Sequence, residues 1–467
     1  MKTSRREMFD ERVLTSGRRF RDFLDRIAEA SPARLALLSF MAVIAVFVAL
    51  LCLPAAHRDP DADVSFAKSL FVAVSAVCVT GLTPVTTEEY WSDFGIAVIT
   101  AAIQVGGLGI LTLASILGMA VSGRLGVRQK LIAAQATNTF QIGQVGTLLR
   151  TVLLTVVIAE ATVAALLFPR FLARGEELGD ALWYSVFYAV SSFNNAGFTI
   201  HPGGMEYFHD DHWILFVIMA AVFVGALGFP CVLMMALFWR TPKKWDLHTK
   251  LTLATSGILV AVGFFFLLLF ESSNPRTLGE EGAFPTAMEV LFMAVMPRSG
   301  GFATMDVADM NQTSHLLFDV LMFIGGGSSS TAGGIKVTTL AVLVLASVAE
   351  ARGLKDVTAF KRRIDPAVIK VSISVTLAGF VIVIAGTLTM LQITRLPLDL
   401  VLFEVISAFG TCGLSSGVSA EASDPGLYVL SLLMFLGRLG TITLAAALST
   451  QSTRRLFKYP EERPIIG

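Results

Sequence analysis

The sequence predicts an all-α polytopic membrane protein, and its composition, its long apolar runs and an internal repeat all point to this class. Of the 467 residues, 54% are apolar and 15% are charged, whereas soluble proteins carry about 25% charged residues. The apolar residues come in runs of about 20, the length that an α-helix needs to cross a bilayer. Gly shows no period and there are only four Cys, which excludes collagen-like and disulfide-scaffold proteins.

Eight apolar runs are the expected membrane-spanning helices. They cover residues 34–53, 93–120, 148–169, 212–239, 249–271, 315–350, 367–393 and 424–449. Eight spans place both chain ends on one side of the membrane, and the segments on that side hold 27 of the 36 Lys and Arg residues. The opposite, outer loops hold seven, Arg298 among them. Because cytoplasmic loops are enriched in Lys and Arg, we expect a multi-pass protein of the cell (inner) membrane with both termini cytoplasmic.

Four shorter segments lie between the paired spans, each of about 14–17 residues and too short to cross a bilayer alone. They align on a Gly that precedes Leu or Phe, and the aligned residues are Gly81, Gly197, Gly301 and Gly413. The intervals between them are 116, 104 and 112 residues. Three segments carry a Ser six residues before the Gly (Ser75, Ser191 and Ser407), where the third segment has Val295. A pattern at four nearly equal intervals is an internal repeat.

Each repeat therefore consists of a span, a short segment and a second span, and the four repeats follow one another along the chain. The expected organisation is a basic cytoplasmic segment at 1–33, repeats at 34–120, 148–239, 249–350 and 367–449, and a cytoplasmic tail at 450–467. Residues 1–33 lack the apolar core of a signal peptide. Four such repeats in one chain predict pseudo-four-fold symmetry around one ion pore.

The physics of a short segment in lipid limits what it can form. It must enter the bilayer as a helix, and it can return as irregular backbone only where it is buried in protein or lines a water-filled cavity. Gly at the turn permits backbone angles that other residues resist. Four return legs around one axis would present rings of carbonyl oxygens, which can replace the hydration shell of a monovalent cation. The partly negative C-terminal ends of the incoming helices would favour the same ion.

The sixth apolar run contains a Gly- and Ser-rich stretch at 323–339. Five Gly and three consecutive Ser make a continuous helix unfavourable there, since each Gly costs about 1 kcal/mol relative to Ala. We expect a broken helix whose irregular part faces the pore. The stretch is not a phosphate-binding P-loop, because Lys336 follows Ile335 rather than Gly. As a charge inside a span, Lys336 either has a function or anchors the loop.

Arg438 is the second charge inside an apolar run. A cation there would repel a passing cation and set a barrier to permeation. The alternative is a structural salt bridge to a buried acid such as Glu160, Glu289 or Glu404. Glu289 and Glu404 lie within short segments, where we expect them to orient the segment by hydrogen bonding.

The remaining chemistry-bearing residues predict no enzyme. The four Cys form no CxxC pair and stand at no metal-ligand spacing. The run that begins at Gly106 reads GLG but lacks the strand–turn–helix context of a dinucleotide site, and it suits close helix packing better. We expect no covalent cofactor, no nucleic-acid partner and no bound metal other than the transported ion; membrane lipid is the expected surrounding.

The chain resembles the Trk/Ktr/HKT superfamily of potassium transporters from about Ala33 to its C-terminus. The stretches that carry the resemblance are VCVTGL (77–82), FNNAGF (193–198), RSGGF (298–302), FGTCGL (409–414), GGGSSSTAGGIKVTT (325–339) and LGRLGTIT (436–443). The resemblance implies a selectivity filter made of Val79, Thr80, Gly81, Asn195, Ala196, Gly197, Ser299, Gly300, Gly301, Thr411, Cys412 and Gly413. It also implies a gate under the filter made of Gly325, Gly326, Gly327, Ser328, Ser329, Ser330, Gly333, Gly334, Lys336 and Arg438. Gly81 stands where some sodium-selective plant members carry Ser, which favours potassium.

The short C-terminus and the absence of extra leading helices are most similar to the Ktr branch of this superfamily. This resemblance implies a homodimer with one pore per chain on a cytoplasmic ring of nucleotide-binding regulatory subunits, which basic loops such as 243–244 and 361–363 could touch. The implied function is potassium uptake driven by the membrane potential, with Na⁺ as a possible activator or co-ion. The alternatives are a sodium or unselective cation pathway and a non-conducting membrane scaffold.

Overall fold

The computed structural model describes residues 32–59, 64–109, 145–278 and 283–450. The protein is mostly helical, and strand structure in these residues is confined to one short hairpin. Most of the expected N-terminal segment, the part of the second expected span after residue 109 and residues 451–467 of the tail lie outside the described residues.

The helices and strands fall into four successive parts of the chain. The first quarter contains α2 (Pro32–Leu51), η1 (Pro54–Ala56), α3 (Phe66–Cys78), α4 (Thr87–Tyr90) and α5 (Asp93–Gly107). The second contains α8 (Val145–Ala173), α9 (Leu178–Phe193), η3 (Glu206–Phe208), α10 (His212–Leu227), α11 (Phe229–Leu237) and η4 (Pro242–Lys244). The third contains α12 (Leu247–Glu271), α13 (Ala283–Val295), η5 (Val307–Asp309), α14 (Gln312–Phe323) and α15 (Val337–Ala351). The last contains β1 (Thr358–Ala359), β2 (Arg362–Arg363), α16 (Pro366–Thr394), α17 (Leu398–Gly410), α18 (Val418–Glu421) and α19 (Asp424–Thr450).

Short polar side chains fix where many of these helices begin. The Asp246 carboxylate accepts a hydrogen bond from the Thr249 amide at the start of α12 (2.8 Å), and Asp365 accepts one from Ala367 at the start of α16 (2.8 Å). Such N-caps satisfy amides that lack a partner within the helix. The apolar runs that follow these caps therefore begin as helices at defined residues.

Among the described residues, α12, α16 and the part of α8 from Arg150 to Ala173 are each long and apolar enough to cross a bilayer. The pair α10 and α11 makes a fourth when it is counted as one span, but it is bent by 101°. The continuous helix expected over 212–239 therefore needs correction. Gly228 has φ +90° between the two helices, and Pro230 two residues later cannot donate the hydrogen bond that would continue α10.

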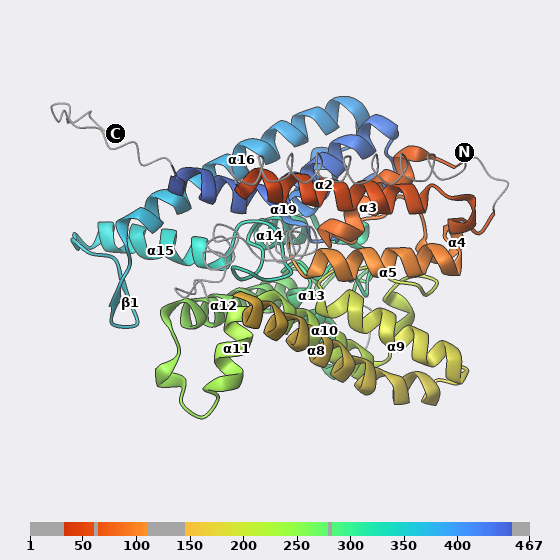
Figure 1. Ribbon diagram of the computed structural model, residues 1–467, viewed down its shortest axis with the longest axis horizontal. Helices are drawn as coiled ribbons and strands as arrows, with labels where there is room; N and C mark the ends of the chain where they lie inside the picture. The colour runs from red at the N-terminus through yellow and green to blue at the C-terminus, as the bar shows by residue number, and fades with distance from the viewer. Residues whose placement is uncertain (1–31, 60–63, 110–144, 279–282, 451–467) are drawn as a thin grey trace, which may run out of the picture.

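The C-terminal parts of the four short helices α3, α9, α13 and α17 are buried in the interior, whereas the starts of α3, α9 and α17 are exposed. Helix α3 packs against α5 and α19, α9 against α8 and α10, α13 against α12 and α10, and α17 against α14, α16 and α19. Figure 1 shows the first and last parts of the chain side by side, with the second part on the opposite side and α14 between them. Each short helix thus packs against neighbouring helices, and its C-terminal end is the buried one.

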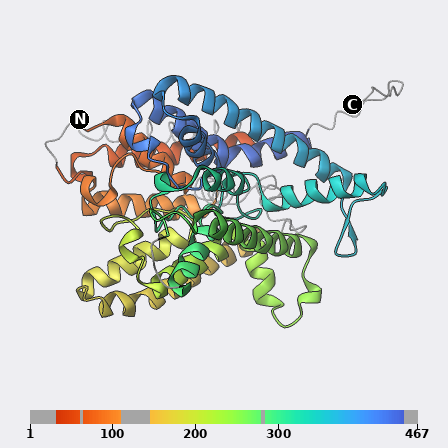
Figure 2. The same ribbon diagram turned by 180° about the vertical axis from the view of Figure 1, so that it is seen from behind.

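Two segments extend away from the helical bundle at the end where α15 terminates. They are α11 with the loop after it, and the β1–β2 hairpin, in which Ala359 pairs with Arg362. Both views of the ribbon show these segments at the same end (Figure 1 and Figure 2).

Candidate functional site

Each short helix is followed by a loop with the same unusual backbone. In every loop the aligned Gly and the residue two positions before it have positive φ. The angles are 57° at Val79 and 101° at Gly81, 61° at Asn195 and 69° at Gly197, 72° at Ser299 and 74° at Gly301, and 45° at Thr411 and 99° at Gly413. Positive φ is uncommon for residues other than Gly and is strained for a β-branched residue such as Val79. The same backbone pattern therefore occurs four times at the positions that define the sequence repeat.

The four loops meet one another in a closed cycle, which we call the glycine ring. A methyl group added at each aligned Gly would contact the carbonyl oxygen that precedes the Gly of a neighbouring loop. The pairs are Gly81 with Ala196, Gly197 with Gly300, Gly301 with Cys412, and Gly413 with Thr80. The methyl group would lie 3.1 Å from the carbonyl oxygen at Gly197 and 2.6 Å from it at Gly301. Since the fourth loop returns to the first, the loops surround a common centre.

Serine side chains hold two of these loops against their own helices. The amide of Gly81 donates to Ser75 Oγ and the amide of Gly413 donates to Ser407 Oγ, each at 3.1 Å. Ser191 instead donates to the carbonyl of Phe198 at 2.9 Å. The serine of the sequence repeat thus stabilises the loop that follows it, a role that the sequence pattern did not assign.

The third loop, which has Val295 at the serine position, is held by one hydrogen bond to the fourth loop and one within its own segment. Ser299 Oγ donates to the carbonyl oxygen of Thr411 at 2.6 Å, and the amide of Gly300 donates to Met296 at 2.8 Å. The third and fourth loops are therefore bonded directly to each other.

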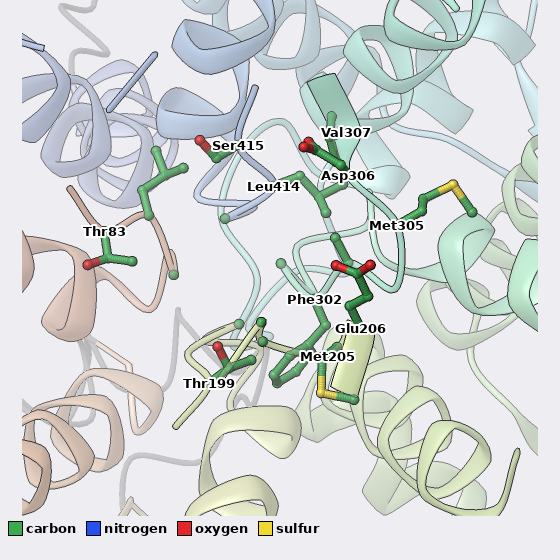
Figure 3. A pocket seen from close by; sticks show the side chains of 18 residues that line it. Thr83, Thr199, Met205, Glu206, Phe302, Met305, Asp306, Val307, Leu414 and Ser415 are labelled. Atoms are coloured by element: carbon green, nitrogen blue, oxygen red, sulfur yellow. The ribbon is translucent and has the colours of Figure 1, made fainter. Parts of the chain in front are cut away.

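Above the glycine ring lies a cavity of about 290 Å³, which all four loops line. Figure 3 shows its labelled residues on four separate segments: Thr83 after the first loop, Thr199 after the second, Phe302 after the third and Ser415 after the fourth. The carboxylates of Glu206 and Asp306 also lie at this cavity. Two negative charges beside the opening would raise the local concentration of cations.

Glu404 ties the outer part of the fourth loop to α17. Its buried carboxylate accepts hydrogen bonds from Ser415 Oγ (3.0 Å), the Ser416 amide (2.9 Å) and the Ser419 amide (3.2 Å). The expectation that Glu404 orients its short segment by hydrogen bonding agrees with this geometry.

We expect Glu404→Gln to lower the free energy of unfolding by about 2 kcal/mol, because hydrogen bonds to a charged group contribute about 1.5–3 kcal/mol. The amide nitrogen of Gln would face amide and hydroxyl donors. A lower midpoint of thermal unfolding in detergent would show this. Glu421→Gln, at an exposed position of α18, is the matched control, and equal midpoints for the two variants would contradict the assignment.

Beneath the glycine ring lies the irregular segment that separates α14 from α15, residues 324–336, which we call the inner loop. Thr331 Oγ1 donates to the Asn195 side chain (2.9 Å), and the Gly333 amide donates to Ser299 Oγ (3.4 Å). A methyl group at Gly333 would overlap the side chain of Thr411. The inner loop therefore contacts the second, third and fourth loops of the ring from below.

Arg438 connects the inner loop to the first repeat. Its guanidinium is buried and donates to the carbonyl oxygen of Thr331 and, at 3.0 Å, to that of Gly106. Two of the acids considered as salt-bridge partners are bonded elsewhere, since Glu160 accepts from Asn194 (2.8 Å) and Glu404 from the serines described above.

Lys336 folds back onto its own loop. Its Nζ donates to the carbonyl oxygens of Ala332 (2.7 Å) and Gly333 (3.4 Å). This geometry agrees with the interpretation that Lys336 anchors the loop.

Arg298, expected among the outer loops, is buried and contacts the inner loop instead. It is 1% exposed, and its guanidinium donates to Ser256 Oγ (3.1 Å) and to the Gly325 carbonyl at the start of the inner loop (3.4 Å). Its position directly before the third loop was the available signal, because a charge beside a buried turn needs a buried partner.

Three glycines of the longer helices allow those helices to approach the ring closely. A methyl group at Gly106, Gly225 or Gly437 would overlap the carbonyl oxygen of Val77, Phe193 or Phe409, respectively. Each of these carbonyls belongs to the residue four positions before an aligned Gly. The close helix packing expected at Gly106 is thus observed, and it recurs in two other repeats.

His201 lies in the loop between α9 and α10, beside the cavity wall. Its Nδ1 atom is 2.8 Å from the Tyr188 hydroxyl and its ring packs on Phe208. Burial, together with the nearby charge of Arg174, lowers the pKa of His201 from 6.5 to about 4. The folded protein therefore holds this histidine neutral in the range where an unfolded chain would protonate it.

We expect the stability of the protein to fall as the pH drops from about 6.5 to 4, by up to about 3 kcal/mol from this group, because the unfolded state binds the proton first. Thermal unfolding measured across this range should show a smaller pH dependence for His201→Gln than for the unchanged chain. His209→Gln, at an exposed position in the same loop, should retain the full dependence. The same pH profile for both variants would exclude His201 as the group responsible.

Comparison with known proteins gives consistent results. The chain is 34% identical to Ktr system potassium uptake protein D of Bacillus subtilis over 444 residues, which cover 94% of this chain and 98% of that protein. It is also 34% identical to Ktr system potassium uptake protein B of Vibrio alginolyticus, over 94% of this chain and 96% of that protein. Potassium/sodium uptake protein NtpJ of Enterococcus hirae is 32% identical over 94% of this chain and 97% of that protein.

The fold is similar to that in the crystal structure of the potassium transporter TrkH from Vibrio parahaemolyticus. The TM-score is 0.67 at 18% sequence identity, and the match covers 89% of this chain and 85% of that one. Residues 39–456 match the TrkH family model, described as a cation transport protein. The chain therefore belongs to the TrkH family of cation transport proteins and, with its long apolar helices, is a multi-pass membrane protein.

Proposed function

We propose that this protein takes up potassium ions through a pore at the centre of the glycine ring. The observation that carries the proposal is the closed cycle in which a carbonyl of each loop faces the aligned Gly of a neighbour. Three relatives, each named a potassium or potassium/sodium uptake protein, support the choice of ion.

The filter would consist of the backbone carbonyls of the four loops, at the residues named from the sequence. Carbonyl oxygens can replace the water around a potassium ion. The short helices α3, α9, α13 and α17 end directly before these loops, so their partly negative C-terminal ends add to the attraction for a cation. A small residue is needed at Gly81, because a methyl group there would overlap the Ala196 carbonyl.

The inner loop would act as the gate. Its contacts with Asn195, Ser299 and Arg438 place it below the ring in this structure, and its glycines leave it few side chains to repack. Arg438 would add an electrostatic barrier for a passing cation. Opening then requires that the inner loop leave the carbonyl and hydroxyl groups that it now contacts.

Uptake of potassium by bacterial cells that lack their own uptake systems tests this function. Rescue of growth at low potassium, together with ⁸⁶Rb⁺ entry, is the expected result. If rescue at low potassium is the same with and without added sodium, sodium is not a required co-ion. Growth failure with confirmed membrane expression would favour the non-conducting scaffold, and sodium entry without rubidium entry would favour the sodium pathway.

The assembly would follow that of a multi-component uptake system, as the word "system" in the names of two relatives suggests. We propose a homodimer with cytoplasmic termini that binds a cytoplasmic ring of nucleotide-binding subunits. We assign the β1–β2 hairpin, with exposed Phe360 and the basic residues 361–363, as the surface that binds the regulatory subunits. Co-purification with the regulatory subunits measures this contact. Its loss in the variant Lys361→Gln, Arg362→Gln, Arg363→Gln would support the assignment.

A further inference from the structure

Helix α11 has features that the pore alone does not explain. It leaves α10 at a bend of 101°, after that helix has ended at Leu227 and the chain has turned at Gly228. Figure 1 shows α11 and the loop after it below α12, extending away from the bundle. A helix that is nearly perpendicular to a membrane span lies along the plane of the bilayer. Its far end exposes large apolar side chains, with Leu237 65% and Trp239 67% accessible.

The loop after α11 is basic. It carries Arg240, Lys243 and Lys244, all exposed, and Lys250 follows on the first turn of α12. The Arg240 guanidinium lies 4.6 Å from the centre of the Trp239 ring. The acid in this stretch, Asp246, is the N-cap of α12. The stretch 240–250 holds four Lys and Arg residues against this one acid, so it keeps a net positive charge beside the exposed tryptophan.

The place of this segment along the chain puts it at the membrane surface. Helix α12 begins at Leu247 and is one of the helices long enough to cross the bilayer. Trp239 precedes that start by only eight residues. Tryptophan and basic side chains together are enriched where a chain lies in the headgroup region, and clustered Lys and Arg attract anionic lipid.

The other end of α11 is bonded to the inner loop. The Phe229 amide donates to the Ser329 carbonyl (3.4 Å), and the Gly327 amide donates to the Ala226 carbonyl (2.7 Å). A methyl group at Gly228 would lie 2.6 Å from the Ser328 carbonyl oxygen. A contact that fixes the direction of α11 therefore also fixes the backbone of residues 226–229, which contacts the inner loop.

We propose that residues 237–244 bind anionic phospholipid headgroups of the inner leaflet and that this contact, through α11, holds the inner loop beneath the glycine ring. The lipid contact stands on exposure, charge and position alone; its effect on ion flow rests on the proposed function. Helix α11 has nine residues and an apolar surface, and three exposed cations follow its end. This combination suits a bilayer surface better than a soluble acidic partner.

The lipid contact can be measured without ion flow. The full chain is reconstituted in vesicles that contain brominated phosphatidylglycerol or, separately, brominated phosphatidylcholine at the same mole fraction, and the Trp239 signal is taken as the difference from Trp239→Phe. We expect several-fold stronger quenching by the anionic lipid, reduced by high salt because exposed charges are screened. The variant Arg240→Gln, Lys243→Gln, Lys244→Gln should lose this preference. The hairpin variant Lys361→Gln, Arg362→Gln, Arg363→Gln, matched in charge, should keep it.

Equal quenching by the two lipids would overturn the proposal, and so would a Trp239 signal that neither lipid quenches. The second result would assign the segment to a protein partner, the regulatory ring or a second copy of the chain.

The link to the inner loop is tested by ⁸⁶Rb⁺ flux in the same vesicles. We expect several-fold lower flux with phosphatidylglycerol than with phosphatidylcholine alone, and no such difference for the triple Gln variant. Gly228→Ala should also lose the lipid dependence of flux while it keeps the lipid preference of Trp239 quenching. Lipid-independent flux in the unchanged chain would disprove the link. Absence of flux in every vesicle would count against the proposed function, while the quenching result would still decide the lipid site.

Discussion

Gly413→Ala is expected to reduce potassium uptake by at least about tenfold while the protein still reaches the membrane. The backbone at Gly413 has φ +99°, which costs an L-residue about 1–2 kcal/mol. A methyl group there would also overlap the Thr80 carbonyl, one of the oxygens assigned to the filter. A shift of that oxygen by even a few tenths of an ångström weakens ion binding, and each 1.4 kcal/mol changes a rate by a factor of about ten.

The matched control is Gly417→Ala, four residues further along the same segment. Gly417 has a similar φ of +89°, but nothing lies within 4 Å of a methyl group there. The two substitutions thus impose the same backbone strain, and they differ in whether the ring is disturbed. Initial rates of ⁸⁶Rb⁺ uptake, normalised to protein in the membrane, compare them. Equal rates for the two variants would mean that Gly413 matters only for folding and not for the ion path.

The second large effect is expected at Arg438. Arg438→Gln should raise the rate of ion flux by about tenfold, because it removes a charge from the path and the hydrogen bonds to the Thr331 and Gly106 carbonyls. A charge-assisted hydrogen bond contributes about 1.5–3 kcal/mol, and at an effective dielectric constant near 20 a cation 4 Å away adds a repulsion of about 4 kcal/mol. Flux in vesicles at fixed potential, without any regulatory subunit, is the measurement.

Arg438→Lys separates the two contributions. Lys keeps the charge but cannot reach two carbonyls in the fixed geometry of a guanidinium. Flux as low as in the unchanged chain would assign the barrier to charge, whereas flux as high as in Arg438→Gln would assign it to the bonds with the inner loop. Unchanged flux in the Gln variant, with normal expression, would remove Arg438 from the gate.

Much of this arrangement is local in sequence and could therefore be predicted. Each short helix ends where its Gly-containing loop begins, so the positions of Gly81, Gly197, Gly301 and Gly413 follow from one repeated pattern. The inner loop could be predicted for the same reason, since five Gly and three Ser within one apolar run are unfavourable in a helix. That these four loops surround a conducting pore stays a prediction.

The contacts between repeats could not be predicted, because they join residues far apart in the chain. Arg438 and Gly106, for example, are 332 residues apart. The break at Gly228 has a local signal, because Pro230 interrupts the apolar run 212–239 and cannot continue a helix. The carbonyl of Ser328, which occupies the space beside Gly228, lies 100 residues further along the chain and could not be predicted.

The hydroxyl of Ser299 couples ion binding at the glycine ring to movement of the inner loop. It donates its one proton to the Thr411 carbonyl of the ring and accepts the Gly333 amide of the inner loop. Departure of the inner loop would leave this hydroxyl with one hydrogen-bond partner and change the electrostatic field at the Thr411 carbonyl oxygen. By thermodynamic linkage, ion affinity at the ring and the equilibrium of the inner loop must then alter each other by the same factor. Potassium would in that case be a ligand that regulates its own passage, and its outside concentration would set the fraction of open molecules.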